Sequence, residues 1–346
     1  MDWLGLVLSL SVILGGAELF TNGVEWVGQA FGLSEGVVGS VLAAIGTALP
    51  ETVLPLIAVL LGRSAGKEIG VGAILGAPLM LTTLAMFVLG ASVLFFSRLR
   101  TRGTTIRLDS AVVRLDLTFF LCMFALAILA GVLKVRAVDW VLALVLVVAY
   151  GLYVRRHLVT PGDRTLQREA AEAIKPLYAR RAARAALGRV AQNPHPPPNW
   201  ASVAQALVGL GIIVGGARAF VVFVTHLSDR FHVPYLAFAL LVAPVATELP
   251  EIFNASVIWA RRGRDTLAVG NITGAMAFQA VFPVTVGLLF TPWRLSGEAL
   301  VAAVVALGAG LILYGTLRFR GRLGAGLLLL QGAIYAGYVV YLVPRL

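Results

Sequence analysis

One five-residue phrase occurs twice in this chain, each time inside a long apolar run. Residues 47–51 read TALPE, and residues 247–251 read TELPE. Proline cannot supply a helical N–H, and lipid cannot solvate a carboxylate, so a Pro-Glu pair at membrane depth is costly in two ways. The repetition of so costly a feature indicates two related halves that share one ion site.

The composition places the whole chain in a membrane. It is 59% hydrophobic and 13% charged, and a soluble domain of 346 residues with that composition could not cover its surface with polar groups. We therefore predict an all-α, multi-pass membrane protein. Runs of about 20 apolar residues predict ten transmembrane helices. They lie at about 3–30, 36–62, 68–97, 110–131, 137–154, 201–227, 234–260, 266–291, 296–317 and 323–343.

Basic residues orient these spans. If the N-terminus is outside the cell, 19 lysines and arginines lie in inner loops and 7 in outer segments. The positive-inside rule favours this arrangement, which places both termini outside the plasma membrane. The net charge of +11 is therefore largely a topology signal and does not indicate nucleic-acid binding. The expected partners are inorganic cations and the lipid bilayer, and the sequence assigns no oligomeric state.

The duplication extends beyond the phrase. Residues 13–20 match residues 213–220 at the same offset, and Gly72 and Gly76 correspond to Gly270 and Gly274 at an offset of 198. Each half carries five spans, an odd number, so the halves enter the membrane in opposite directions. We expect two inverted five-helix repeats with broken helices at the midplane. The first repeat is 1–154, a basic cytoplasmic linker is 155–199, and the second repeat is 200–346.

The phrase offers oxygen ligands for a cation. Pro50 and Pro250 leave the carbonyls four residues earlier without a helical donor, and unpaired backbone at membrane depth survives where it lines a cavity or meets a ligand. Threonine hydroxyls and glutamate carboxylates lie next to these carbonyls. Such hard oxygens suit Ca²⁺ and Na⁺. There is no phosphate-binding loop and no nucleophile–base arrangement, so we expect neither an enzyme nor a cofactor.

The pattern resembles the cation/Ca²⁺ exchanger superfamily, in particular its prokaryotic sodium/calcium exchanger branch. The family signature is a Gly-Thr-Ser-Leu-Pro-Glu helix break followed by a Gly-Asn-x-x-Gly-Ser-Asn-x-x-Asn helix, once per repeat, and the resemblance covers essentially the whole chain. It implies that Glu51 and Glu251 coordinate Ca²⁺ at the midplane and that Thr47 and Thr247 assist. It also implies alternating access, in which spans one and six slide against the other eight.

The chain departs from this signature in several places. Ala48 and Glu248 replace the serines, and span three holds Ala73, Ala77, Pro78 and Leu81 where the family has polar ligands. Span eight keeps Asn271 and has Gln279 for the last asparagine, and Asn254 follows Glu251 by three residues. The candidate metal-site residues are Glu51, Glu251, Thr47, Thr247, Glu248, Asn271, Asn254, Gln279 and the backbone carbonyls of Gly46 and Ala246.

These departures leave the coupling ion open. Glu248 either adds a third carboxylate or points away, because adjacent helical residues face different directions. Several sodium sites would be hard to build without ligands on span three, and crowded buried carboxylates tend to hold protons until a cation enters. We expect a secondary antiporter that exchanges Ca²⁺, or a similar cation, for Na⁺ or H⁺. The alternatives are a proton-coupled exchanger for another cation and a non-transporting membrane scaffold.

Overall fold

A computed structural model describes residues 2–30, 48–61, 63–100, 103–106, 108, 110–159, 198–248, 252, 256, 260–261, 263–295 and 297–345. Every regular element in these ranges is a helix. The helices are α1 (Asp2–Ala30), α4 (Leu49–Leu61), α5 (Arg63–Met80), the π-helix η2 (Leu81–Ala85), α6 (Met86–Phe95), α7 (Ser110–Leu133), α8 (Arg136–Val159), α11 (Asn199–Phe231), α12 (Tyr235–Thr247), α14 (Asp265–Gln279), α15 (Phe282–Phe290), α16 (Gly297–Arg320) and α17 (Ala325–Leu342), with a short 3₁₀ turn η4 (Val343–Arg345) at the end.

The helices confirm an all-helical membrane protein. Eight segments in the described ranges are long and apolar enough to cross a membrane, and they match predicted spans one, three to six and eight to ten. Spans two and seven are described only in part, as the shorter apolar helices α4 and α12. The full set of ten spans in two inverted repeats stays a prediction.

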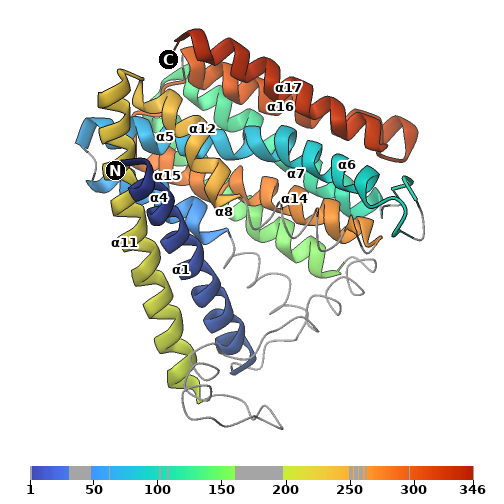
Figure 1. Ribbon diagram of the computed structural model, residues 1–346, viewed down its shortest axis with the longest axis horizontal. Helices are drawn as coiled ribbons and strands as arrows, with labels where there is room; N and C mark the ends of the chain where they lie inside the picture. Colours follow the sequence, from blue (N-terminus) through green and yellow to red (C-terminus); the bar gives the residue numbers. More distant parts are fainter. Residues whose placement is uncertain are drawn as a thin grey trace.

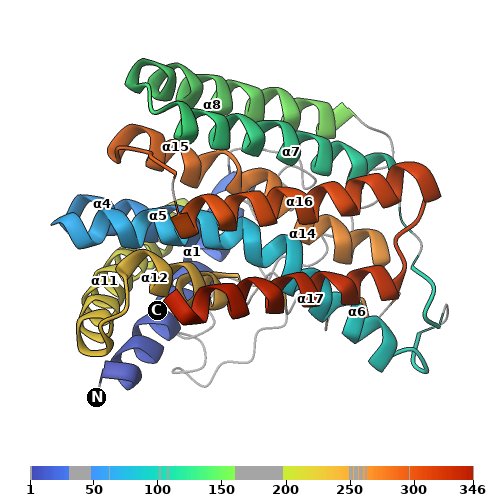
Figure 2. The same ribbon diagram turned by 90° about the horizontal axis from the view of Figure 1, so that it is seen from above.

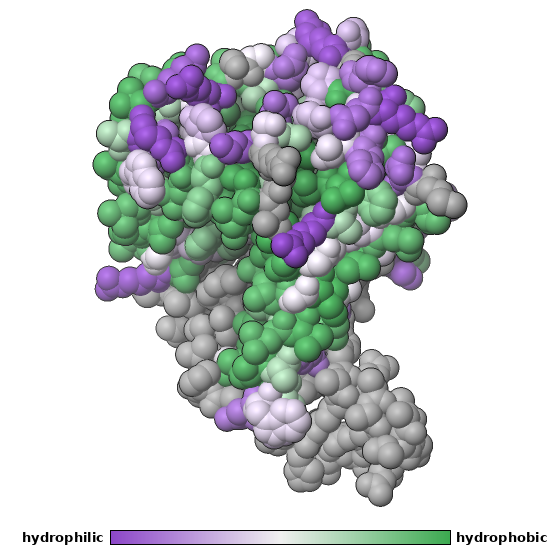
Figure 3. All heavy atoms as spheres, turned by 90° about the vertical axis from the view of Figure 1, so that its left-hand side faces the viewer, coloured by the Kyte–Doolittle hydropathy of each residue, from purple (hydrophilic) through white to green (hydrophobic). Residues whose placement is uncertain are grey.

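Helices α1 and α11 form a pair on one side of the main bundle, where they pack against α4 and α12. They run side by side and cross the other helices at a steep angle (Figures 1 and 2). Glycines permit this close approach. A Cβ on Gly209 would come 2.6 Å from the backbone nitrogen of Phe20, and one on Gly16 would come 2.9 Å from that of Ile213. In side view the surface of this helix pair is mainly hydrophobic (Figure 3).

Spans three and eight form the interior of the bundle. Their apolar windows are 78% and 72% buried, against 22–44% for the other six candidate spans. Both are interrupted. Span three passes from α5 through η2 to α6 after Pro78, and span eight breaks between α14 and α15, where Pro283 lies in the first turn of α15. Interrupted helices in the interior are where a membrane protein can expose backbone to a ligand.

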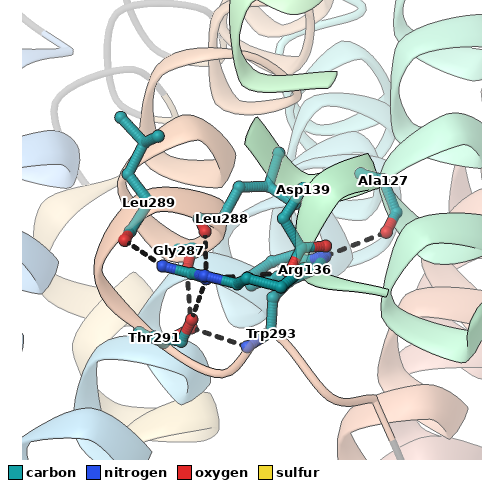
Figure 4. Close-up of polar contacts among 8 residues, drawn as sticks. All are labelled: Ala127, Arg136, Asp139, Gly287, Leu288, Leu289, Thr291 and Trp293. Carbon is teal, nitrogen blue, oxygen red and sulfur yellow. Dashed lines mark hydrogen bonds and ion pairs between the residues drawn. The ribbon is translucent and has the colours of Figure 1, made fainter. Parts of the chain in front are cut away.

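One end of span eight is tied to the hairpin of α7 and α8 (Figure 4). The guanidinium of Arg136 donates hydrogen bonds to the carbonyls of Leu288, Leu289 and Thr291, which are unpaired at a helix C-terminus. The indole N–H of Trp293 donates to the carbonyl of Ala127 at 3.0 Å. These contacts anchor the end of α15 to the neighbouring spans.

Candidate functional site

The second copy of the phrase lies at the end of a helix. Helix α12 ends at Thr247, and Glu248 follows directly as its C-cap. The Glu248 side chain is 0% exposed and that of Thr247 is also buried, with its hydroxyl donating to the carbonyl of Ala243 at 3.3 Å. Ala246 lies in the last turn of α12.

The first copy lies at the start of a helix. Helix α4 begins at Leu49, which places Pro50 in the first turn, where a missing N–H costs nothing. Glu51 is also in this first turn and is 4% exposed. The positive end of the helix dipole stabilises a carboxylate at that position. The chain therefore keeps an acidic group inside the protein at the N-terminus of an otherwise apolar helix.

Glu248 forms a hydrogen bond with a side chain of span eight. The amide Nε2 of Gln279 donates a hydrogen bond to Glu248 Oε1 at 2.8 Å, and Gln279 is 1% exposed. The side-chain oxygen of Gln279 accepts no hydrogen bond from any described residue. Because the amide is fixed by its own N–H, this oxygen is held beside the carboxylate. The pair can thus offer a cation one carboxylate and one amide oxygen.

The remaining candidate residues lie farther along α14 or outside the described residues. Asn271 is half-buried on α14, eight residues before Gln279, which is about 12 Å along the helix. Gly46, Thr47, Glu251 and Asn254 lie outside the described residues, so the pairing of Glu51 with Glu251 stays a prediction. In the part of the chain that is described, no three His, Cys, Asp or Glu residues gather as a metal cluster.

Span three contains two hydroxyls that the sequence analysis did not single out. Thr82 and Thr83 lie in η2 and are fully buried. Thr82 donates to the carbonyl of Pro78 at 2.8 Å, and Thr83 donates to the carbonyl of Leu79. Proline inside a helix was the available signal, because it disturbs the backbone pairing around it. Span three therefore directs these hydroxyls to its own backbone.

Two further buried polar contacts tie α14 to other elements. Asp265, at the start of α14, pairs with the guanidinium of Arg100 at 2.7 Å, and both side chains are buried. Thr273, two turns further on, donates to Asp116 of α7 at 2.6 Å. Sequence reasoning missed both contacts because the partners are more than 150 residues apart and carry no spacing signal.

The arrangement is suited to a cation. Glu51 and Glu248 are carboxylates inside an apolar bundle, and Gln279 and Thr247 add neutral oxygens. Buried carboxylates are stable only with a proton, a hydrogen-bond donor or a cation beside them. The fold and these side chains define a multi-pass membrane protein with acidic, oxygen-rich groups on interrupted helices.

The chain belongs to the family described as sodium/calcium exchanger protein, whose model matches residues 1–158 and 201–343. It is a transmembrane cation antiporter of the cation/Ca²⁺ exchanger superfamily. It is 25% identical over 346 residues to CaxA of Alkalimonas amylolytica, an antiporter by name, with 97% of each chain covered. It is also 25% identical to the inner membrane protein YrbG of Escherichia coli K12, with 95% of this chain and 93% of that one covered.

Solved structures share the fold. The sodium-calcium exchanger NCX_Mj superposes with a TM-score of 0.56 at 21% identity, covering 98% of this chain and 99% of that one. The H⁺/Ca²⁺ exchanger CAX superposes with a TM-score of 0.66 at 17% identity, covering 99% and 87%. At such low identities the likeness concerns the fold and does not choose between sodium and proton coupling.

Proposed function

We propose that this protein exchanges Ca²⁺, or a cation of similar chemistry, for Na⁺ or H⁺ by alternating access. The cation binds between the two copies of the repeated phrase, at Glu51 and Glu251, with help from Thr47 and Thr247. Glu248, Gln279, Asn271, Asn254 and the carbonyls of Gly46 and Ala246 complete the oxygen set. The observation that carries the proposal is the burial of Glu51 and Glu248 inside an apolar bundle of this family.

The division of the molecule into two parts supports alternating access. Helices α1 and α11 pack mainly against each other, while α14 is tied by polar side chains to α7, to α12 and to the loop after α6. The pair can therefore slide past the rest while the cation ligands on α4 and α14 stay in place. With both termini outside, the basic linker 155–199 faces the cytoplasm.

Flux into proteoliposomes tests the proposal. Vesicles are loaded with Na⁺, or are given an imposed pH gradient, and uptake of ⁴⁵Ca²⁺ is measured. Uptake under a sodium gradient, a proton gradient or both is the expected result, and uptake driven by the proton gradient alone removes sodium coupling. Failure of uptake under every gradient, together with higher thermal stability of both Glu51→Gln and Glu251→Gln, would support the scaffold alternative.

Proton coupling to another cation is the second candidate function, and Glu248 favours it. This position holds serine in the family signature, whereas here it holds a fully buried carboxylate. An additional acidic group adds a place where a proton can be held until a cation enters. Competition of ⁴⁵Ca²⁺ uptake by Mn²⁺, Mg²⁺ and Na⁺ separates the two functions, because the tightest competitor identifies the preferred cation.

A further inference from the structure

A buried carboxylate outside the candidate cation site joins three helices. Asp116 of α7 is 2% exposed. Its Oδ2 accepts a hydrogen bond from the hydroxyl of Thr273 on α14 at 2.6 Å, and its Oδ1 accepts one from the hydroxyl of Tyr153 on α8 at 2.9 Å. Thr273 and Tyr153 are buried as well. One carboxylate therefore holds α14 against the hairpin of α7 and α8.

The corresponding positions on α16 and α5 hold apolar residues. Helices α7 and α16 each have 24 residues, and the seventh residue is Asp116 in one and Ala303 in the other. At the offset of 198 that relates spans three and eight, Thr273 corresponds to Leu75 of α5. Ala303 and Leu75 are both fully buried, and α5 packs against α16 as α14 packs against α7. The fold can therefore pack two helices at these positions without polar groups.

Packing alone does not account for Asp116. A buried carboxylate costs desolvation free energy that an apolar pair of similar volume does not. The polar contact occurs on α14, the helix that keeps Asn271 and Gln279, and the apolar one occurs on α5, where Ala73, Ala77 and Pro78 replace the polar residues. The contact that carries a desolvation cost therefore occurs on α14, the helix whose polar side chains, Asn271 and Gln279, belong to the candidate site.

Thr273 is close enough to Gln279 to control its position. It lies six residues earlier on the same helix, about 9 Å along the axis. The hydrogen bond from Gln279 to Glu248 is 2.8 Å long, and such bonds weaken steeply when the donor turns or withdraws. A rotation of α14 about its axis, or a shift along it, therefore changes the length and angle of the hydrogen bond from Gln279 to Glu248.

We propose that Asp116 is a positioning residue for the cation site. Through Thr273 it fixes the rotation and depth of α14, so that Gln279 and Glu248 are held together in the arrangement that the cation requires. Tyr153 of α8 donates to the other carboxylate oxygen, Oδ1. The effect on transport rests on the proposed function, whereas the effect on α14 does not.

Two substitutions of Thr273 make a matched test. Thr273→Val removes the hydroxyl at nearly constant volume, and Thr273→Ser keeps it. We expect Thr273→Val to raise the ⁴⁵Ca²⁺ concentration for half-maximal uptake about tenfold, as the loss of a buried hydrogen bond to a charged group implies. The maximal rate should change little, and Thr273→Ser should match the unmodified protein. A contact that serves only stability would lower the amount of active protein and leave half-saturation unchanged.

Two more variants serve as controls for the Thr273 substitutions. Tyr153→Phe removes the other hydrogen bond to Asp116 and should leave half-saturation close to the unmodified value. The double variant Asp116→Ala with Thr273→Leu copies the apolar residues of α16 and α5, Ala303 and Leu75, so it should fold and still show the affinity loss of Thr273→Val. Unchanged half-saturation in Thr273→Val or in the double variant overturns the proposal, as does an equal loss in Tyr153→Phe.

Amide hydrogen exchange separates this proposal from the proposed function. In purified protein, residues 274–279 should exchange faster in Thr273→Val than in Thr273→Ser, whether or not any cation is transported. If the unmodified protein moves no cation under any gradient, the proposed function fails and the exchange of α14 still decides the role of Asp116. Equal exchange in the two variants overturns the positioning role.

Discussion

Spans three and eight hold corresponding places in the two predicted repeats but use their polar groups in opposite ways. In span three, the hydroxyls of Thr82 and Thr83 donate to carbonyls of their own helix. In span eight, Asp265, Thr273 and Gln279 all contact other elements. Both spans are mostly buried and in both the α-helix is interrupted. Span three stays helical through its π-turn, whereas span eight leaves the helix at Ala280 and Val281, so the two spans differ in backbone as well as in side chains.

This difference shows that a duplicated fold does not imply a duplicated site. If span three contributes few ligands, the cation depends mostly on the second repeat, on Glu51 and on backbone oxygens. A one-sided ligand set has fewer places for several sodium ions than a symmetric one, which is why we favour low stoichiometry or proton coupling. Single substitutions test whether the two spans differ in this way.

The largest effect is expected at the buried ion pair that starts span eight. Arg100 donates to Asp265 and to the carbonyls of Gly103, Thr105 and Ala260. Arg100→Met removes the guanidinium from the buried carboxylate of Asp265 and should lower the free energy of unfolding by about 3–5 kcal/mol. Unfolding in detergent–SDS mixtures measures it.

A matched control exists at the opposite end of span eight. Arg136→Met also removes a guanidinium that donates to backbone carbonyls and pairs with a buried carboxylate, that of Asp139. This pair is 3.6 Å long and the Arg136 side chain is 47% exposed, so water can partly replace it. We expect a loss of about 1–2 kcal/mol there. Equal losses for Arg100→Met and Arg136→Met would mean that the short, fully buried pair with Asp265 contributes no more than the longer, partly exposed pair with Asp139.

Glu51 should show the largest effect on transport itself. Glu51→Gln keeps the size of the side chain but removes the charge that balances a divalent cation, so we expect ⁴⁵Ca²⁺ uptake to fall at least about 100-fold. Glu51→Asp keeps the charge and should retain part of the activity. Uptake by Glu51→Gln at the unmodified rate would remove the first repeat from the cation site altogether.

The sequence predicted the helices better than the contacts between them. Apolar runs located eight spans to within a few residues, because lipid imposes both length and composition on a spanning helix. The direction of Glu248 stayed open, since a position next to a proline break has no fixed helical face. The partners of Thr273 and Asp265 come from distant parts of the chain, and only the folded backbone brings them together.

A smaller effect on transport is expected at Gln279. Gln279→Leu removes both the donor to Glu248 and the neighbouring amide oxygen, and it should raise half-saturation for ⁴⁵Ca²⁺ about tenfold. Gln279→Asn restores the asparagine of the family signature and should recover part of the affinity. If Gln279→Leu behaves like the unmodified protein, neither the amide oxygen of Gln279 nor its hydrogen bond to Glu248 serves the cation site.

The smallest effect is expected in span three. Thr83→Val removes a hydroxyl that, within the described residues, donates to the carbonyl of Leu79 in its own helix. Half-saturation should therefore change by less than about twofold and stability by about 1 kcal/mol. The same substitution at Thr273 in span eight should cost about tenfold in affinity, which makes the two threonines a direct test of the contrast. A loss at Thr83 as large as that at Thr273 would show that span three takes part in cation binding through the π-helix. The asymmetry between the repeats would then be one of ligand type and not of ligand number.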